Sequence, residues 1–237
     1  ARGYLDLALF EIGWSFHGGE PGEQHLLVSG LLIGRTGPKD VHGAARPVDV
    51  YDVKADAEAI LAAMGAPAKV QIGRGAAAWW HPGRHGMIQL GPKKLLGVFG
   101  EVHPKILTEM DIKGPAMAFT LWPGEIPEPR SKGTTKPALA ASDLQAVERD
   151  FAFVLDADVE ALNVVNAASG ADKALIESVR VFDEFVGGSL GDGRKSLAIT
   201  VRLQPADKTL TDEEIEAVAA KVVEKVNKAT GGVLRGA

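Results

Sequence analysis

The chain has 237 residues, of which 46% are hydrophobic, and this is enough for two ordinary domain cores. It contains no cysteine, which excludes disulfides, thiolate metal sites and cysteine nucleophiles. No apolar run approaches the roughly 18 residues of a membrane span, and no signal-peptide pattern is present. We therefore expect a folded cytoplasmic protein with no membrane contact.

Charge is distributed unevenly along the chain. Residues 1–141 hold 15 basic and 14 acidic side chains, a net charge of +1, whereas residues 142–237 hold 11 and 17, a net charge of −6. The bulk charge of the second part opposes non-specific phosphate binding, so any nucleic-acid role must depend on a local basic face. Because the chain starts at Ala1 and not at Met, we expect it to belong to a longer protein.

The first region alternates short apolar runs with glycine- and proline-rich turns. A helical stripe that ends before Gly65 predicts one helix, and Pro104 is placed to start a second, short one. Strands are predicted over 5–16, 25–33, 69–72, 87–90, 95–100 and 116–122, and helices over 53–64 and 104–110. This pattern predicts an antiparallel α+β unit. Residues 127–141, rich in Pro, Lys, Ser and Thr, are predicted to be a linker.

The terminal region begins with a strand over 147–156, in which Phe151, Phe153 and Leu155 alternate with other residues. Asp158 is predicted to cap a helix that runs to residue 169, and strands over 178–186 and 195–204 form a hairpin. Thr211 opens a capping box before an amphipathic helix, and a short strand follows over 233–235. The order β-α-β-β-α-β is that of the ferredoxin-like fold, an antiparallel sheet with both helices on one face.

The uncovered face of this sheet is the first candidate binding surface. Strand alternation places Ser196, Ala198, Thr200 and Arg202 on it, whereas the acidic run 212–216 belongs to a helix on the opposite side. A cluster of basic side chains on or around such a face could hold RNA phosphates, although the spacing fits a solvated surface equally well. The side chains predicted to contact RNA are Arg149, Arg180, Arg194, Lys195, Ser196, Arg202 and Arg235.

A second candidate is the segment around His81, His85 and His103, which offers three imidazoles for a metal ion. Pro82 and Gly83 prevent the helical spacing that would direct two of them to one ion, so a rigid turn is the preferred interpretation. Trp79 and Trp80 precede this turn and form either core or an interface patch, with core the favoured choice. The sequence contains no Walker loop, no dinucleotide-binding glycine motif and no Gly-x-Ser-x-Gly elbow.

Several motifs in order resemble a known family. Residues 148–154, 181–185, 193–198 and 209–214 resemble the ferredoxin-fold anticodon-binding domain that ends the β subunit of bacterial phenylalanyl-tRNA synthetase. Residues 9–13, 45–49, 81–84 and 97–104 resemble the class II core-like module that precedes this domain in the same subunit. Phe185 stands where the family usually has a tyrosine, which puts any hydroxyl contact there in doubt.

The resemblance implies that residues 1–126 form a catalytically inactive class II core-like module and residues 142–237 an anticodon-binding domain for tRNA(Phe). It also implies packing against an α subunit, which carries the active site, in an (αβ)₂ assembly. Trp79, Trp80, His81 and Arg84 are the expected subunit-interface residues. We expect no catalytic residue, metal or cofactor in this part of the chain, whereas ATP and magnesium would serve the whole enzyme. Editing and magnesium residues would precede Ala1.

Two other interpretations remain open at this point. One is a stand-alone RNA-binding or scaffold protein built from the same two modules. The other, which the motifs favour least, is a metalloenzyme that uses the three histidines.

Overall fold

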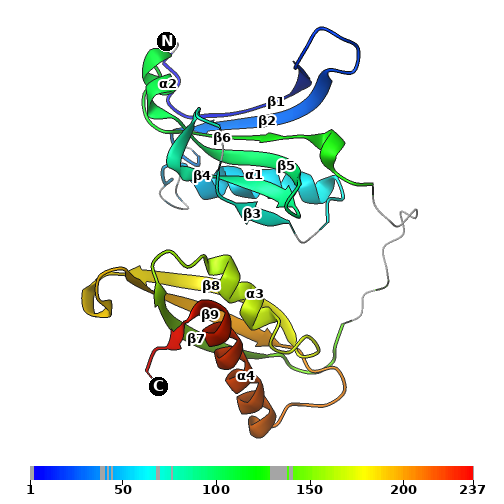
Figure 1. Ribbon diagram of the computed structural model, residues 1–237, viewed down its shortest axis with the longest axis vertical. Coiled ribbons are helices and arrows are strands. Elements are labelled where there is room, and N and C mark those ends of the chain that lie inside the picture. Colours follow the sequence, from blue (N-terminus) through cyan, green and yellow to red (C-terminus); the bar gives the residue numbers. More distant parts are fainter. Residues whose placement is uncertain are drawn as a thin grey trace. The chain divides into compact units, whose positions relative to one another are not determined.

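The computed structural model describes residues 3–37, 41, 43, 45–67, 70–75, 77–128, 138 and 141–236. The chain divides into two compact units, residues 1–136 and 137–237, and each is described by itself (Figure 1). Most of the predicted linker lies outside the described residues, so its limits at 127 and 141 stay a prediction.

The first unit is built on a six-stranded antiparallel sheet with the strand order β1-β2-β6-β5-β4-β3 (Figure 1). The strands are Leu7–Phe16 (β1), Gln24–Ile33 (β2), Gln71–Gly73 (β3), Trp80–Leu90 (β4), Lys94–Val102 (β5) and Ala116–Leu121 (β6). Each strand pairs antiparallel with its neighbours, which confirms the predicted α+β antiparallel architecture. Among the described strands β1 pairs with β2 alone and is therefore an edge strand.

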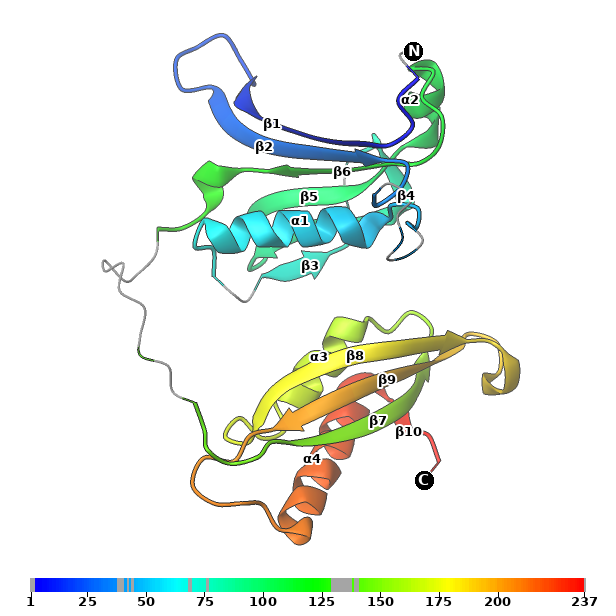
Figure 2. The same cartoon turned by 180° about the vertical axis from the view of Figure 1, so that it is seen from behind.

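Helix α1 (Val50–Ala63) covers one face of this sheet (Figure 2). The Asp49 side chain accepts hydrogen bonds from the first turn of the helix and completes a capping box with Asp52. The buried stripe of α1 packs with Phe119 and Leu121 of β6 in the main core. The shorter α2 (Pro104–Glu109) begins at Pro104, as predicted, and contributes to a separate small cluster. A single 3₁₀ turn, η1 (Pro123–Glu125), follows β6.

The predicted turn at residues 81–84 is wrong, because these residues belong to β4. The pairing of β4 with β5 is irregular between Trp80 and His85. His85 Nδ1 lies 2.6 Å from the His81 carbonyl oxygen, and the Gly83 amide donates to His81 Nδ1 at 3.1 Å. These local bonds satisfy polar groups that the interrupted ladder leaves without a partner, so the strand continues through the irregularity.

The second unit is a four-stranded antiparallel sheet with the order β10-β7-β9-β8 and with both helices on one face (Figures 1 and 2). Its elements are β7 (Val147–Asp156), α3 (Ala161–Ser169), β8 (Ile176–Val186), η2 (Gly188–Leu190), β9 (Arg194–Leu203), α4 (Asp212–Thr230) and β10 (Val233–Leu234). This is the predicted ferredoxin-like fold, with β7 in a central position as expected.

The core of the second unit lies between the sheet and the two helices. Alternate residues of β9, from Leu197 to Leu203, are at most 2% exposed, as the strand period predicts. Ile215, Val218, Val222 and Val226 of α4 form the matching apolar stripe. Burying each such side chain contributes about 1.5–3 kcal/mol relative to leaving it exposed.

Both ends of α4 follow from the sequence. The Thr211 side chain accepts from the Glu214 amide, and the Glu214 carboxylate accepts from the Thr211 amide, which confirms the capping box. Gly231 ends the helix at φ +69°, a left-handed conformation that favours glycine. The predicted cap of α3 is wrong, because Glu160 and not Asp158 precedes that helix and makes no side-chain cap bond. A turn precedes α3, and in this turn the Val159 amide donates to the Asp156 carbonyl oxygen.

Candidate functional site

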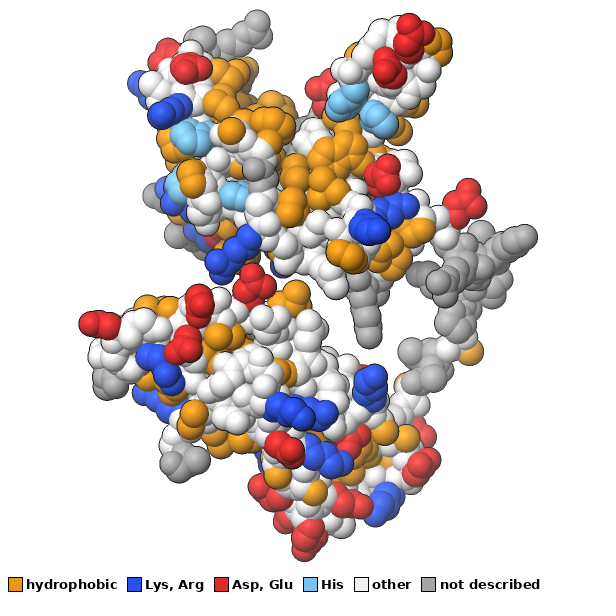
Figure 3. Space-filling view, viewed as in Figure 1, with side chains coloured by type: hydrophobic (Ala, Val, Ile, Leu, Met, Phe, Trp, Pro, Cys, Tyr) orange, Lys and Arg blue, Asp and Glu red, His pale blue; other side chains and the backbone are white. Residues whose placement is uncertain are grey.

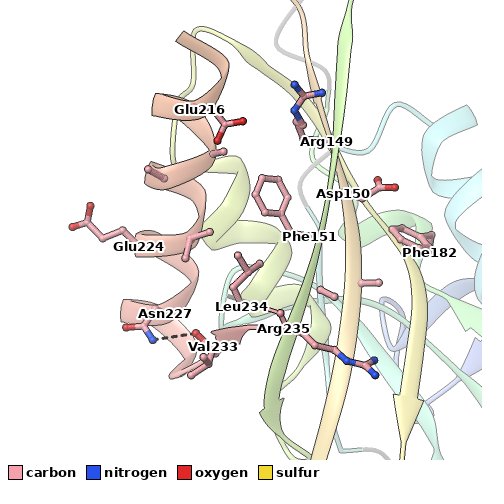
Figure 4. A pocket seen from close by; sticks show the side chains of 17 residues that line it. Arg149, Asp150, Phe151, Phe182, Glu216, Glu224, Asn227, Val233, Leu234 and Arg235 are labelled. Carbon is pink, nitrogen blue, oxygen red and sulfur yellow. Dashed lines mark hydrogen bonds between the residues drawn. The ribbon is translucent and has the colours of Figure 1, made fainter. Parts of the chain in front are cut away.

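The face of the second sheet that points away from α3 and α4 carries side chains from all four strands. Strand pairing places Arg180 opposite Thr200, and Ser178 opposite Arg202, on this face. The Arg235 amide bonds to the Ala152 carbonyl oxygen at 2.7 Å, which continues the register of β10 beside β7. Arg235 points to the side of the sheet opposite α4 (Figure 4).

The basic residues on this face differ in what surrounds them. The Arg202 guanidinium lies 2.6 Å from Glu177 and 3.3 Å from Glu148, and hydrogen bonds to these two carboxylates raise the pKa of Arg202. Arg194 lies 3.2 Å from Asp156 at the hairpin end. Among the residues that the structure describes, Arg180 and Arg235 form no ion pair. These two guanidinium groups are therefore the ones free to meet an anionic ligand.

A shallow hollow of about 490 Å³ surrounds Arg180. Its lining includes the ring of Phe182, which is 50% exposed, and the Thr200 hydroxyl, which donates to Asp150 Oδ1 at 2.7 Å. Glu148 and Asp150 also line it, so acidic and basic side chains are mixed around this hollow. A guanidinium beside an exposed aromatic ring can hold one phosphate and stack one unpaired base.

Two of the predicted RNA-contacting residues do not lie on this face. Lys195 pairs with Leu155 on the helix side and is only 7% exposed, and its ammonium lies 3.8 Å from Glu184. Arg149 shares the side of β7 that carries Phe151, but it also lines the hollow around Arg180 from the edge of the sheet, and its Nη1 is within 3.5 Å of the Glu148 carbonyl oxygen. Ser196 lies on the open face but is 5% exposed. On the open face the expected cluster therefore consists of Arg180, Arg202 and Arg235, with Arg149 and Arg194 at the rim.

Sequence reasoning did not select Phe182 and Phe185 as site residues, although both are exposed on β8. Alternation from Val179 and Val181, which pack on the core, places Phe182 on the open face with Arg180. A register shift between Val181 and Asp183 then brings Phe185 opposite Ser196 on the same face. The first ring could have been found from strand period, whereas the second depends on a bulge that the sequence does not mark.

In the first unit, the residues predicted for a subunit interface separate into different environments. Trp79 is 57% exposed, whereas Trp80 is 5% exposed and, within the described residues, its indole Nε1 has no hydrogen-bond partner. His81 is part of the irregular stretch of β4 described above. Arg84 donates to both carboxylate oxygens of Glu101, and its hydrogen bonds lower the Glu101 pKa. Trp80 cannot form contact surface, and Arg84 is engaged within the unit.

The larger apolar surface of this unit is the edge strand β1, which sequence reasoning did not single out. Phe10, Ile12, Trp14 and Phe16 alternate on one side of the strand and are 80%, 61%, 62% and 70% exposed. Leu9, on the other side, is 53% exposed. Figure 3 shows hydrophobic side chains gathered on the visible face of this unit below the β1–β2 hairpin. Such a surface, on the order of several hundred Å², is typical of a protein–protein contact.

The described residues contain neither a cluster of metal-ligating side chains nor a helix that could span a membrane. Within them, no group of three or more His, Asp or Glu side chains is placed to hold a metal ion, so these residues do not fit a magnesium or zinc site. No described helix is long and apolar enough to cross a membrane.

Comparison with known proteins agrees with the two units. Residues 142–235 match the ferredoxin-fold anticodon binding domain. Residues 1–122 match the phenylalanyl tRNA synthetase beta chain CLM domain. The chain belongs to the phenylalanyl-tRNA synthetase β-chain family. This confirms the resemblance that the sequence motifs indicated.

Similar curated proteins carry the name phenylalanine–tRNA ligase beta subunit. The chain is 75% identical to the one from Ruegeria pomeroyi over 236 residues, 67% identical to that from Cereibacter sphaeroides over 240 residues, and 52% identical to that from Rhodospirillum rubrum over 237 residues. These alignments cover 99–100% of this chain but 30% of each relative. The chain thus spans about a third of the length of the relatives it matches.

Proposed function

We propose that this chain forms the tRNA-binding and subunit-packing part of a phenylalanine–tRNA ligase β subunit. In this proposal the whole enzyme joins phenylalanine to tRNA(Phe) in the cytoplasm with ATP and magnesium. The described residues supply no metal site, so we assign no step through magnesium to this chain. The proposed contribution of this chain is to bind tRNA and to pack against the other subunit.

The second unit is proposed to hold the anticodon arm on its open sheet face. The hollow around Arg180 and Phe182 carries this proposal, because it combines an unpaired cation with an exposed ring on a rigid strand. Anticodon bases are unstacked and can stack on a ring, while a guanidinium holds the adjacent phosphate. Arg235 offers a second phosphate contact on the same face.

The first unit is proposed to pack against the α subunit in an (αβ)₂ assembly through the apolar side of β1. A surface of four large side chains at 61–80% exposure favours assembly over a stand-alone RNA-binding protein. Trp79 can extend this contact, whereas Trp80 cannot because it is buried.

The RNA proposal is tested by measuring tRNA(Phe) affinity against salt in the complete enzyme. Arg180→Ala should weaken binding and lower the magnitude of the salt slope by about 0.7, because one phosphate contact to a single strand is lost. Phe182→Leu keeps the apolar contact but removes the stacking ring, so it should weaken binding by about 1–3 kcal/mol without changing the slope. Lys225→Ala, on α4, is the matched control. Equal affinity and slope for Arg180→Ala and Lys225→Ala would show that the open face is not the binding surface.

A further inference from the structure

The sheet of the second unit has an incompletely paired edge. β10 pairs only at Val233 and Leu234 with Val154 and Phe153 of β7, and one further bond joins Arg235 to Ala152. Among the described residues, β10 is the strand beyond β7 on this side, and it does not pair with residues 147–151, which form a free edge. The Glu148 carbonyl oxygen accepts from Arg149 Nη1 at 3.5 Å. The Ala152 carbonyl points toward this edge, where it accepts from the Arg235 amide. Because the backbone groups of a strand alternate in direction, the amides and carbonyls of Asp150 and Glu148 point toward the same edge. The Asp150 amide and carbonyl therefore point out of the sheet without a strand partner.

This free edge opens into a groove of about 1010 Å³ between β7 and α4 (Figure 4). The wall on the helix side is apolar and shallow, because Ala219, Ala220 and Val223 present small side chains toward it. Phe151 projects from β7 toward α4 and forms the floor. Glu216 stands at the end of the groove nearest Arg149 (Figure 4).

We propose that this groove accepts an extended polypeptide segment that adds to the free edge of β7 as a further strand. The occupant has small aliphatic side chains facing Ala219 and Val223, and a Lys or Arg facing Glu216. The groove lies mainly at the edge and on the helix side of the sheet, but its lining also includes Phe182 and Arg235 of the open face, so a bound peptide would adjoin the proposed RNA-binding face.

Three features select a peptide strand as the occupant. Outward-facing backbone amides and carbonyls at strand spacing are matched by another extended backbone. The free stretch of five residues spans about 17 Å, which fits a short strand. The small side chains of the helix wall leave room for aliphatic side chains of the peptide. The Glu216 carboxylate favours a cationic side chain over a phosphate. Because Arg149 and Arg235 also line the groove, the choice of a peptide over a nucleic acid rests on the outward-facing backbone groups and the apolar helix wall.

The test uses the 237-residue chain and a capped heptapeptide, Thr-Val-Thr-Val-Thr-Lys-Thr, which places Val and Lys on one face of a strand. NMR titration should shift the amides of Asp150, Phe151 and Ala220. Asp150→Pro removes the outward amide and should weaken binding about tenfold, the effect of one lost hydrogen bond of about 1.4 kcal/mol. Asp150→Ala loses the same carboxylate but keeps the amide, so it should bind as the unsubstituted chain does.

Charge selection is tested separately. Replacing the peptide Lys by Glu should weaken binding to the unsubstituted chain, and Glu216→Gln should remove this preference. Glu213→Gln, on the same helix but outside the groove lining, should leave the preference unchanged. Equal binding by the Asp150→Pro and Asp150→Ala chains, both with native-like spectra, would overturn the proposal. Displacement of the peptide by a single-stranded RNA oligonucleotide that shifts the Ala220 amide, which lines the groove and not the Arg180 hollow, would also overturn it. Neither result bears on the contribution of Arg180 to tRNA affinity.

Discussion

The ion pair between Arg84 and Glu101 is the feature of the first unit whose removal has the most specific consequences. The Glu101 side chain is 7% exposed, and Arg84 donates to both of its carboxylate oxygens. The distance from Arg84 Nη2 to Glu101 Oε1 is 2.9 Å. Arg84→Ala would leave the carboxylate buried without its donor. A hydrogen bond to a charged group contributes about 1.5–3 kcal/mol, and the 52% exposure of Arg84 reduces the Coulomb part through solvent screening. We therefore expect a loss of about 2 kcal/mol in the free energy of unfolding at neutral pH.

The loss should depend on pH in a defined direction. The Arg84 hydrogen bonds hold the folded-state pKa of Glu101 below its ordinary value of 4.5. The stabilisation from this group is therefore fully present above pH 4.5 and is lost as pH falls through the folded-state pKa. In Arg84→Ala, burial without a donor favours the protonated acid and should raise the same pKa. The difference between the two proteins should be largest at neutral pH and shrink as the medium becomes more acidic than the folded-state pKa.

Tryptophan fluorescence can follow this unit alone, because the four tryptophans are Trp14, Trp79, Trp80 and Trp122. Urea unfolding should show a midpoint lower by about 1 M for Arg84→Ala at neutral pH, given a slope of about 2 kcal/mol/M. The control is Lys54→Ala, which breaks an exposed i,i+4 pair with Glu58 and should cost only about 0.3–0.5 kcal/mol. If the two substitutions cost the same, or if the Arg84→Ala loss does not change with pH, the reasoning about the buried carboxylate is refuted.

Three further outcomes can be measured on the same chain. Thr211→Ala removes the side-chain acceptor of the α4 capping box and should lower the unfolding free energy of the second unit by about 1 kcal/mol, as followed by circular dichroism. Gly97→Ala should lower the unfolding free energy of the first unit by about 1–3 kcal/mol. The added Cβ would lie 2.9 Å from the Thr120 carbonyl oxygen and closer still to the Leu121 side chain. An unchanged unfolding free energy would mean that β5 and β6 can separate easily. Phe10→Ser should change stability by less than about 0.5 kcal/mol, since Phe10 is 80% exposed, yet it should reduce co-elution with the α subunit; unchanged co-elution would exclude β1 from the contact.

The fold of the second unit could be predicted because its sequence signals are local and agree with one another. The alternation around Phe153 and Leu197, the capping box at Thr211 and the glycine at 231 each specify one element. Lys195 is predicted at the hairpin end, on the rim of the open face. It shares strand parity with Leu197, and this parity places its side chain on the core side.

The surroundings of the candidate site residues could not be predicted, because they depend on contacts between residues far apart in the chain. Arg202 is neutralised by Glu148 and Glu177, which precede it by 54 and 25 residues, and no local pattern shows this pairing. Trp79 and Trp80 are adjacent, and one of two adjacent residues at a strand end faces the core while the other faces solvent. Which of the two is buried depends on how β4 pairs with β5. The edge position of β1, which exposes its apolar side, is likewise set by strand order and not by local sequence.

The charge pattern of the second unit constrains how it can bind RNA. The carboxylates of Asp212, Glu213 and Glu216 belong to α4, which packs on the far side of the sheet. Packed layers are about 10 Å apart, and the Debye length at physiological salt is about 8 Å, so these charges are largely screened from the open face.

On the open face itself, Arg180 and Arg235 form no ion pair among the described residues, while Arg202 is held by two carboxylates. Two free cations imply about two phosphate contacts, and for a single strand a salt slope of about 1.4 in magnitude. Such a small electrostatic contribution cannot supply most of the affinity. Stacking on Phe182 and Phe185, at about 1–3 kcal/mol for each base, must therefore carry the larger share of anticodon binding if this face is the site.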